Sequence, residues 1–320
     1  MSSLEQVRKL SIFVPLVVAL LSLLIIMKSA SYSLNAIVSY AKTTGISEYI
    51  IGFFVVSVGT TMPELFTAIF SSLSNNGAIS LGNVMGANVI DVTLIMGITA
   101  IIGRKILIKD ELSKSSLVIL GVMAMPLLLG FDGKLSRYDG FILIGSFFIY
   151  TISLLRRAKG AGRIKADIKL RHVWKDIFVF GGTVAALILA VRWFVLSTST
   201  MAYMLNIPNF LMGALFVALG TTTPELIVNI KSVMRGHAGV GFGDLIGSAC
   251  ANITLIVGIA SIINPIYFDN VRFIASSVFM LLTVGLALFI LKRGRISWKN
   301  GIFLASIYIL FVLMQSIIQV

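Results

Sequence analysis

Long apolar runs separated by short polar segments follow one another along all 320 residues of the chain. Each run is close to the ~20 residues that an α-helix needs to cross a bilayer. Backbone polar groups in lipid must be satisfied within their own segment. The pattern therefore predicts an all-α polytopic membrane protein with ten transmembrane helices. The expected spans lie near residues 10–38, 47–73, 78–103, 115–131, 139–155, 176–199, 208–234, 239–264, 272–291 and 300–318.

The first apolar run follows Arg8 and Lys9, a charge order that also precedes the apolar core of secretory signal peptides. This run is 18 residues long, from Leu10 to Met27, and no small-residue cleavage site follows it. We therefore interpret it as the first span and not as a cleaved leader.

The chain repeats itself at an offset of 161 residues. The segment Gly59-Thr60-Thr61-Met62-Pro63-Glu64 recurs without a gap as Gly220-Thr221-Thr222-Thr223-Pro224-Glu225. The same offset joins Gly52 to Gly213, Gly82 to Gly243, Gly86 to Gly247, Asp91 to Asn252, Thr93 to Thr254, Gly97 to Gly258, and Asp139-Gly140 to Asn300-Gly301. A single ungapped offset over this length is hard to obtain by chance.

The repeat divides the chain into two halves, residues 1–155 and 176–320, which a basic linker at 156–175 joins. The repeated motifs cover residues 52–97 and 213–258. Because each half holds five expected spans, an odd number, the second half must enter the membrane from the opposite side. The predicted architecture is therefore two inverted five-helix repeats, an arrangement common among transporters.

Composition agrees with this pattern and excludes several classes of protein. Hydrophobic residues make up 58% of the chain and charged residues 12%, whereas ordinary soluble domains carry about 25% charged residues. A soluble enzyme, a secreted disulfide scaffold and a disordered protein are excluded on this ground. The single cysteine, Cys250, excludes disulfides within the chain and a thiolate metal cage. Two histidines, His172 and His237, are too few for a zinc cluster.

The basic residues predict how the chain is oriented. Lysine and arginine number 26 against 13 acids, which gives a net charge of +13. If the central linker is cytoplasmic, 19 of the 26 lie on the cytoplasmic side, five lie outside, and Lys28 and Arg192 fall within spans. The positive-inside rule then places both termini outside, in a multi-pass protein of the plasma membrane. We expect the linker to be a solvated loop attracted to anionic lipid headgroups, and we expect no nucleic-acid partner.

Four acidic residues, Glu64, Asp91, Glu225 and Asp244, lie within or at the edge of the apolar spans. Such a charge costs at least ~2.5 kcal/mol to insert, so it marks a functional site by default. Glu64 and Glu225 each follow a mid-span proline, which has no N–H and therefore leaves a helical carbonyl without its partner. We expect opened backbone and threonine hydroxyls around each glutamate at mid-membrane.

Two readings without a binding site stay open for these acids. Each Pro-Glu pair is a plain proline kink beside a chance glutamate in the first reading. In the second, the acids form structural ion pairs with Lys28 or Arg192, although these two long side chains could also snorkel to an interface.

The third span of each half adds a polar helix face. Two trios at spacing i, i+4 and i+8 each share one face; they are Asn83, Ala87 and Asp91, and Asp244, Ser248 and Asn252. We expect the inverted symmetry to bring both proline-broken helices and both polar faces together near the midplane. The predicted cation site holds Glu64, Glu225, Asp91, Asn252, Ser248 and the oxygens of Thr60, Thr61, Thr221 and Thr222.

All of these ligands are hard oxygen donors, which suit Ca²⁺, Mg²⁺ or Na⁺ and not soft transition metals. Two glutamates and one aspartate bring up to three negative charges into a low dielectric, so an empty site is costly to move across the membrane. That cost favours exchange, because one cation load leaves only when another neutralises the acids. Proton loading of the glutamates is the competing way to neutralise them.

On these residues the chain resembles the cation/calcium antiporter superfamily, most closely the prokaryotic sodium/calcium exchangers. The two alpha repeats of that family match the paired Gly-Thr-Thr-x-Pro-Glu motifs, together with Gly82-Asn83 through Asp91 and Gly243-Asp244 through Asn252. The resemblance covers essentially the whole chain. It implies a secondary active antiporter that exchanges Ca²⁺ for Na⁺ by alternating access, in which the long first and sixth spans slide across the rest.

The resemblance also implies individual roles. It implies that Ca²⁺ is held by Glu64, Glu225 and the oxygens of Thr60 and Thr221. It implies that Asp91, Ser248 and Asn252 help to hold Na⁺ or Ca²⁺. It also implies that the backbone at Ser57 and Ala218 lines sodium sites.

Three departures from the family pattern affect this expectation. Ala87 stands where exchangers often have a hydroxyl, which puts one sodium site in question. Aspartate lies in the first repeat and asparagine in the second, whereas some relatives show the reverse, and potassium-dependent relatives also carry an aspartate at the position of Asp91. Asp244 replaces the usual asparagine and adds a fourth acid, which either attracts cations or only packs.

A membrane enzyme is the alternative from a different class. Gly241-Phe242-Gly243-Asp244 matches the Gly-x-Gly-Asp motif of intramembrane aspartyl proteases, and Tyr138-Asp139 mimics their Tyr-Asp partner. Such a protease needs two aspartates that share a proton, whereas the expected spans place Asp139 and Asp244 near opposite sides of the membrane. A passive cation channel is the other remote alternative.

We therefore predict an antiporter that exchanges Ca²⁺ for Na⁺ and is not an enzyme. A Ca²⁺/H⁺ exchanger and a K⁺-dependent Na⁺/Ca²⁺ exchanger stay open as alternatives. Ca²⁺, Na⁺ and membrane lipid are the expected partners, no cofactor is expected, and no oligomer is required.

Overall fold

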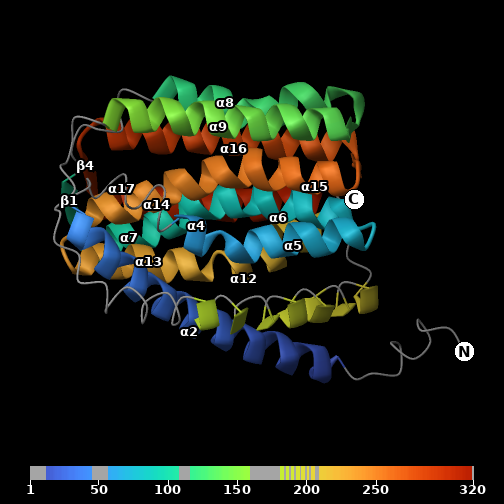
Figure 1. Ribbon diagram of the computed structural model, residues 1–320, viewed down its shortest axis with the longest axis horizontal. Helices are drawn as coiled ribbons and strands as arrows, with labels where there is room; N and C mark the ends of the chain where they lie inside the picture. Colours follow the sequence, from blue (N-terminus) through green and yellow to red (C-terminus); the bar gives the residue numbers. More distant parts are fainter. Residues whose placement is uncertain are drawn as a thin grey trace, which may run out of the picture.

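The computed structural model is almost entirely helical in the part of the chain that it describes (Figure 1). It describes residues 12–44, 57–107, 116–158, 181–205 with gaps at 184, 187, 188, 191, 195, 199 and 202, and 209–318. The first half contains α2 (Phe13–Thr44), α4 (Ser57–Thr60), α5 (Met62–Leu73), α6 (Gly77–Ile90), the π-helical turn η2 (Asp91–Ile95), α7 (Met96–Gly103), α8 (Ser116–Leu129), the 3-10 turn η4 (Gly130–Asp132) and α9 (Arg137–Ala158).

The helices of the second half follow in the same order. They are α11 (Asn209–Leu211), the π-helical turn η5 (Met212–Val217), α12 (Ala218–Thr221), α13 (Thr223–Met234), α14 (Ala238–Cys250), the π-helical turn η6 (Ala251–Ile256), α15 (Val257–Ile263), α16 (Asn270–Lys292) and α17 (Trp298–Ile317). A shift of 161 residues carries α5 onto α13 and the continuous α6–η2–α7 onto α14–η6–α15, to within one residue at each boundary. The sequence repeat is therefore also a repeat of structure.

Close glycine contacts join the two halves in a reciprocal way. A Cβ on Gly97 in α7 would lie 2.8 Å from the carbonyl oxygen of Gly301 in α17, and one on Gly258 in α15 would lie 2.9 Å from that of Gly140 in α9. Gly97 and Gly258 are repeat partners, and so are Gly140 and Gly301. Interchanging the halves turns one contact into the other, as a twofold relationship between them requires. Small residues allow this close approach of helices.

Four short strands lie in the helix connections, and the all-helical prediction did not include them. β1 (Lys105–Leu107) pairs antiparallel with β4 (Arg295–Ser297), and β2 (Lys134–Leu135) pairs antiparallel with β3 (Ile266–Tyr267). Interchanging the halves again turns one pair into the other. Strands of two or three residues carry no periodic signal that a sequence could show.

The strand pairing also groups the connections by end of the bundle. β1 and β4 bring the connection before α8 to the same end as the connection before α17, and both are rich in lysine and arginine (Figure 1). β2 and β3 bring the two connections with fewer basic residues together. The distribution of basic residues predicts the same grouping.

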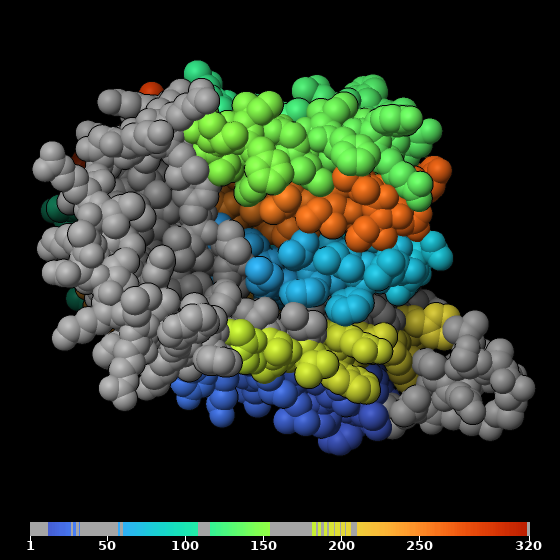
Figure 2. All heavy atoms as spheres, viewed as in Figure 1, coloured from blue at the N-terminus to red at the C-terminus, as the bar shows by residue number. Residues whose placement is uncertain are grey.

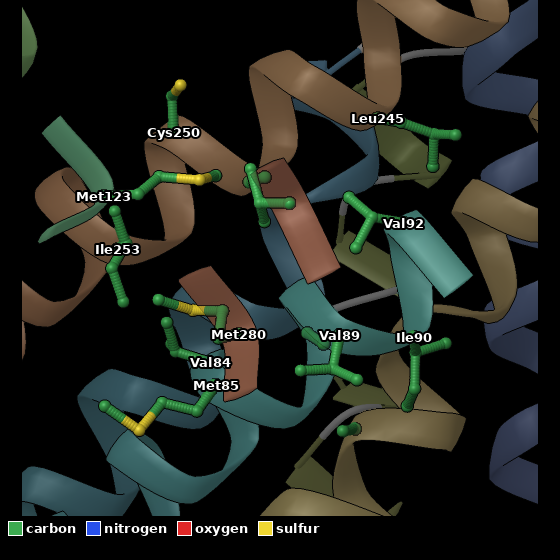
Figure 3. Close-up of a cluster of buried hydrophobic side chains, with 14 of the residues drawn as sticks. Val84, Met85, Val89, Ile90, Val92, Met123, Leu245, Cys250, Ile253 and Met280 are labelled. Carbon is green, nitrogen blue, oxygen red and sulfur yellow. The ribbon is translucent and has the colours of Figure 1, made fainter. Parts of the chain in front are cut away.

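The main apolar core is built from both halves. Figure 3 shows part of it, where Val84 and Met85 of α6 lie near Met280 of α16, and Met123 of α8 lies near Cys250. Cys250 is a free, fully buried thiol within this cluster. This agrees with the expectation that it points away from the polar face of its span.

A separate layer lies at one edge of the bundle. It consists of α2 and the helical residues between 181 and 205, which Figure 1 and Figure 2 show in blue and yellow. A second apolar cluster, which shares no residue with the main core, joins this layer to the rest; it contains Ala19, Ile26, Ile79, Ala190, Phe194, Met212 and Val217. The layer is therefore held by its own, smaller cluster.

The helices confirm the expected class of fold. Within the described residues, four helices are long and apolar enough to cross a membrane: 77–103, 238–263, 270–292 and 298–317. The helices Met212–Thr221 and Thr223–Met234 are bent by 44° relative to each other, and they form a fifth span if the bent pair is counted as a single span. The protein is thus a helical, multi-pass membrane protein. The count of ten stays a prediction, because expected spans such as 47–73 include residues outside the described part of the chain.

Candidate functional site

Both proline-containing helices are broken at the same position of the repeat. Thr61 separates α4 from α5 with φ −80° and ψ 0°, and Thr222 separates α12 from α13 with φ −78° and ψ 0°. Pro63 and Pro224 then lie in the first turn of the following helix, where a missing N–H removes no helical hydrogen bond. The predicted opening of the helix at each motif is confirmed.

Threonine hydroxyls at each break lie against a backbone carbonyl. The carbonyl oxygen of Ser57 accepts hydrogen bonds from Thr61 N at 2.9 Å and Thr61 Oγ1 at 2.5 Å, and Thr60 Oγ1 lies 3.2 Å from it. The repeat partners make the same three contacts to the carbonyl oxygen of Ala218, at 2.9, 2.8 and 3.4 Å. Each break therefore gathers one carbonyl and two hydroxyl oxygens, and the carbonyls belong to Ser57 and Ala218, the positions that the resemblance to the exchangers implied.

Three buried carboxylates have no hydrogen-bond partner among the described residues. Glu64 and Asp91 are 0% exposed and Glu225 is 1% exposed. By distance and angle, no described residue donates a hydrogen bond to an oxygen of these three carboxylates. An unpaired buried carboxylate is very costly, and proteins normally pair such a group or use it to bind a metal ion. These three groups are therefore the strongest candidates for binding a cation.

Hydrogen bonds between the halves join each helix break to the polar face of the other half. Thr60 at the first break bonds Asp244 on α14, and Thr221 at the second break bonds Asn83 on α6. The helix breaks and the polar faces of both halves therefore meet in one place, as predicted.

Among the described residues, no lysine, arginine or histidine donates a hydrogen bond to Glu64, Asp91 or Glu225. Lys28 and Arg192 are both exposed, so the ion pairs considered from the sequence are absent at these two positions. No three His, Cys, Asp or Glu side chains in the described part of the chain are close enough to hold a metal ion by themselves. A cation bound here therefore also needs hydroxyl, amide or carbonyl oxygens.

Asp244 differs from the other three carboxylates because both of its oxygens accept hydrogen bonds. Thr60 Oγ1 donates to Oδ1 at 2.9 Å, and Asn229 Nδ2 donates to Oδ2 at 3.1 Å. Asn229 also donates to the carbonyl oxygen of Glu225 at 2.9 Å, which ties it to its own helix. Asp244 is thus a satisfied acceptor that links α14 to the break of the first half.

The same link exists in the other half without the charge. Thr221 Oγ1 donates to Asn83 Oδ1 at 3.1 Å, and these two residues are the repeat partners of Thr60 and Asp244. The two threonines at the site therefore have acceptors of different charge.

The remaining predicted residues lie on α14 and η6. Ser248 Oγ lies 3.4 Å from Thr60 Oγ1. Asn252 Nδ2 donates to Asn88 Oδ1 at 3.2 Å, while Asn252 Oδ1 is buried and accepts no hydrogen bond from the part of the chain that the structure describes. Ala87, the repeat partner of Ser248, is fully buried and brings no oxygen from its side chain.

Two asparagines at the site were not expected there. Asn229 bonds Asp244, and Asn88 bonds Asn252. The 161-residue offset held a signal for both, because it aligns Asn88 with Ala249 and Asn229 with Ala68. Where a polar residue in one half aligns with an alanine in the other, the polar side chain makes a contact that the other half lacks.

The aspartate of the protease alternative has a local structural role. Asp139 Oδ2 accepts hydrogen bonds from Ser136 N at 2.8 Å and Ser136 Oγ at 2.6 Å, at the start of α9. The repeat partners, Ser297 and Asn300, form the capping box of α17. Asp139 is therefore a helix-capping residue, and Tyr138 beside it is 82% exposed.

Comparison with known families agrees with this geometry. The family model described as sodium/calcium exchanger protein matches residues 14–156 and 175–317, one match for each half.

Individual proteins are similar over nearly the whole chain. The sodium/calcium exchanger MaX1 of Methanosarcina acetivorans is 26% identical over 343 aligned residues, which cover 94% of this chain and 98% of that protein. The inner membrane protein YrbG of Escherichia coli is 28% identical and covers 92% of this chain and 94% of its own. A solved structure of the sodium-calcium exchanger NCX_Mj, soaked with Na⁺ and Sr²⁺, superposes with a TM-score of 0.76 at 25% identity, covering 93% of this chain and 97% of that chain.

Proposed function

Because the chain belongs to the sodium/calcium exchanger protein family, we propose that it is a secondary active antiporter that exchanges Ca²⁺ for Na⁺ by alternating access. The observation that carries the proposal is the set of three buried carboxylates that no described residue hydrogen-bonds, beside two symmetry-related helix breaks. The protein is a transporter and not an enzyme.

The electrostatics of the site favour exchange over one-way movement. An uncompensated carboxylate in apolar surroundings costs several kcal/mol, even after local relaxation. A bound cation removes much of that cost, so the protein can change between its outward- and inward-facing states with a load and not when empty. One load then leaves only when another takes its place.

The proposed Ca²⁺ ligands are the carboxylates of Glu64 and Glu225 and the hydroxyl oxygens of Thr60 and Thr221. Ca²⁺ accepts about 6–8 oxygen ligands in flexible geometry, which suits a mixture of carboxylates and neutral oxygens. We further infer that Na⁺ or Ca²⁺ is held by the carbonyls of Ser57 and Ala218, the hydroxyls of Thr61, Thr222 and Ser248, and the side chains of Asp91 and Asn252.

Two other exchange reactions use the same acids. Asp91 and Asp244 add negative charge beyond the two glutamates, which favours an additional monovalent cation and so a K⁺-dependent exchange. Protonation of the glutamates instead of Na⁺ binding gives a Ca²⁺/H⁺ exchange. Both are alternatives that the transport assay below distinguishes.

The edge layer supports the proposed alternating access. α2 and the helical residues between 181 and 205 contact the rest of the bundle through a separate, small apolar cluster. We propose that this layer slides across the bundle and uncovers the site first on one side and then on the other, while the main core stays packed.

The proposed topology has ten spans in two inverted repeats of five, with domain limits at 1–155, 156–175 and 176–320. We propose that both termini are extracellular and that the linker is cytoplasmic, in the plasma membrane. The asymmetry of lysine and arginine supports this orientation, and so does the grouping of the connections by β1–β4 and β2–β3.

The test is Ca²⁺ uptake into proteoliposomes with Na⁺, K⁺ and H⁺ gradients imposed one at a time. The proposal predicts uptake that follows an outward Na⁺ gradient and needs neither a pH gradient nor K⁺. Uptake driven equally well by a pH gradient alone supports Ca²⁺/H⁺ exchange, and Na⁺-driven uptake that requires K⁺ supports the K⁺-dependent reaction. Uptake without any counter-gradient indicates a channel.

A further inference from the structure

We infer that Asn88 is a positioning residue that turns the side-chain amide of Asn252 so that its oxygen, and not its NH₂ group, faces the cation site. The inference rests on the proposed function and adds a residue to it. Asn88 lies on α6 in the first half, and Asn252 lies on η6 in the second half.

A backbone carbonyl fixes which end of the Asn88 amide is which. Asn88 Nδ2 donates to the carbonyl oxygen of Ala249 at 3.2 Å, and the same NH₂ group lies 3.5 Å from Met280 Sδ. A carbonyl oxygen accepts and never donates, so the end of Asn88 that faces it must be the NH₂ group. The other end, Oδ1, is then necessarily an acceptor.

This acceptor fixes Asn252 in turn. Asn252 Nδ2 donates to Asn88 Oδ1 at 3.2 Å. The amide of Asn252 therefore presents Oδ1 on its other side, where the oxygen is buried and has no partner among the described residues. Without Asn88, the amide is free to rotate and to present two N–H donors to a cation, which repel it.

The comparison of the two halves supports this role. The repeat partner of Asn252 is Asp91, and the repeat partner of Asn88 is Ala249. A carboxylate presents an oxygen whichever way it is turned, so Asp91 needs no orienting neighbour. Only the half that has an amide at the ligand position has a second asparagine to orient it.

The structure of the interaction suggests a double-mutant cycle. Asn88→Ala, which introduces the residue type found at the partner position, is made in the wild-type chain and in the Asn252→Asp variant. Ca²⁺ and Na⁺ affinities are measured from half-saturating concentrations for flux and, independently of flux, from ion-dependent shifts of melting temperature in detergent. Gln315→Ala is the matched control, because Gln315 is a buried amide whose hydrogen bond to Ser276 involves none of the candidate site residues.

Partners that orient a metal ligand change metal affinity by about 10- to 100-fold when removed. We therefore expect Asn88→Ala in the wild-type chain to lower the affinity for at least one of the two ions, Ca²⁺ or Na⁺, by about tenfold. In the Asn252→Asp background the same change should alter affinity by less than about twofold, since an acid at that position needs no orientation. Gln315→Ala should leave both ion affinities unchanged.

A second variant keeps the inference testable if one of the variants in the double-mutant cycle does not fold. Asn88→Gln retains an acceptor for Asn252 Nδ2 and a donor for the carbonyl oxygen of Ala249, so it should lose less affinity than Asn88→Ala. Equal losses in both backgrounds, no loss in the wild-type chain, or a larger loss in Asn88→Gln than in Asn88→Ala would each overturn the inference. Absence of Na⁺-dependent Ca²⁺ flux in the wild-type protein would instead contradict the proposed function itself.

Discussion

Thr60 in the first half donates a hydrogen bond to the carboxylate of Asp244 in the second half at 2.9 Å. The symmetry-related contact, between Thr221 and Asn83 at 3.1 Å, has a neutral acceptor. The hydroxyl hydrogen of each threonine is therefore directed at the opposite half, which leaves lone pairs of the oxygen for other contacts. The two halves are alike in geometry and unlike in charge.

The first prediction concerns Asp244→Asn. Both oxygens of Asp244 already accept hydrogen bonds, from Thr60 and Asn229, so we expect Asp244 to support the site without contacting the ion. The substitution keeps an acceptor for Thr60 and disturbs the contact with Asn229, at a cost of about 1–3 kcal/mol in stability. Na⁺-driven Ca²⁺ uptake should persist, with a lower melting temperature. Complete loss of uptake in a folded variant would show that Asp244 binds the ion.

The second prediction concerns Asp91, the acid of the first half whose repeat partner in the second half is the neutral Asn252. Asp91→Asn removes one charge from the site, and charge interactions of about 1–4 kcal/mol predict a loss of Ca²⁺ affinity of about 5- to 700-fold. Adding Asn252→Asp returns a carboxylate to the partner position, and we expect most of the affinity to return. Radiolabelled Ca²⁺ uptake at varied Ca²⁺ measures both variants. A double variant that is no better than the single variant would contradict this equivalence of the two positions.

The third prediction tests the packing between the halves. A Cβ on Gly86 would lie 2.1 Å from the carbonyl oxygen of Ala214, which is backbone and cannot move aside. Gly86→Ala should therefore destabilise the protein by about 3 kcal/mol or more, the upper part of the range for overpacking. Gly145→Ala is the control, because a Cβ there meets nothing within 4 Å. It should be neutral or stabilise by up to about 1 kcal/mol. Thermal unfolding followed by size-exclusion chromatography compares the two, and similar melting temperatures would count against the close contact.

The fourth prediction tests the proposed sliding layer. A Cβ on Gly220 would lie 2.0 Å from Cζ of Phe194, which belongs to the edge layer. Overpacking usually costs about 1–3 kcal/mol. If this cost adds to the free-energy barrier for sliding of the edge layer, Gly220→Ala should slow turnover by about 5- to 150-fold. Adding Phe194→Ala removes the ring and should restore part of the rate. Initial uptake rates at saturating Ca²⁺ measure this, and a variant with unchanged turnover would contradict a movement at this contact.

The sequence was sufficient for those features that repeat or follow a helical period. The 161-residue offset relates Gly97 to Gly258 and Gly140 to Gly301, so the Gly97–Gly301 and Gly258–Gly140 contacts are equivalent, and the breaks at Thr61 and Thr222 follow from the prolines. Proline removes a donor wherever it stands, so its effect is local and can be read without a fold.

Other features depend on how the halves dock, and the sequence could not supply them. The π-helical turn at η2 begins at Asp91, and no periodic pattern announces it. The contacts of Asn88 with Asn252 and of Asn229 with Asp244 join residues on different helices, so their pairing depends on helix packing. The role of Asp244 as a satisfied acceptor could be recognised only from these contacts.

The central claim is that Glu64 and Glu225 carry the exchanged Ca²⁺. Its most direct measurement is Ca²⁺ uptake into proteoliposomes under an outward Na⁺ gradient, for the wild-type chain, Glu64→Gln and Glu225→Gln at equal reconstituted amounts. We expect Na⁺-driven uptake in the wild-type protein and uptake no higher than in protein-free liposomes for either variant, because glutamine leaves the Ca²⁺ without one of its carboxylates. Wild-type rates in either folded variant would contradict the central claim.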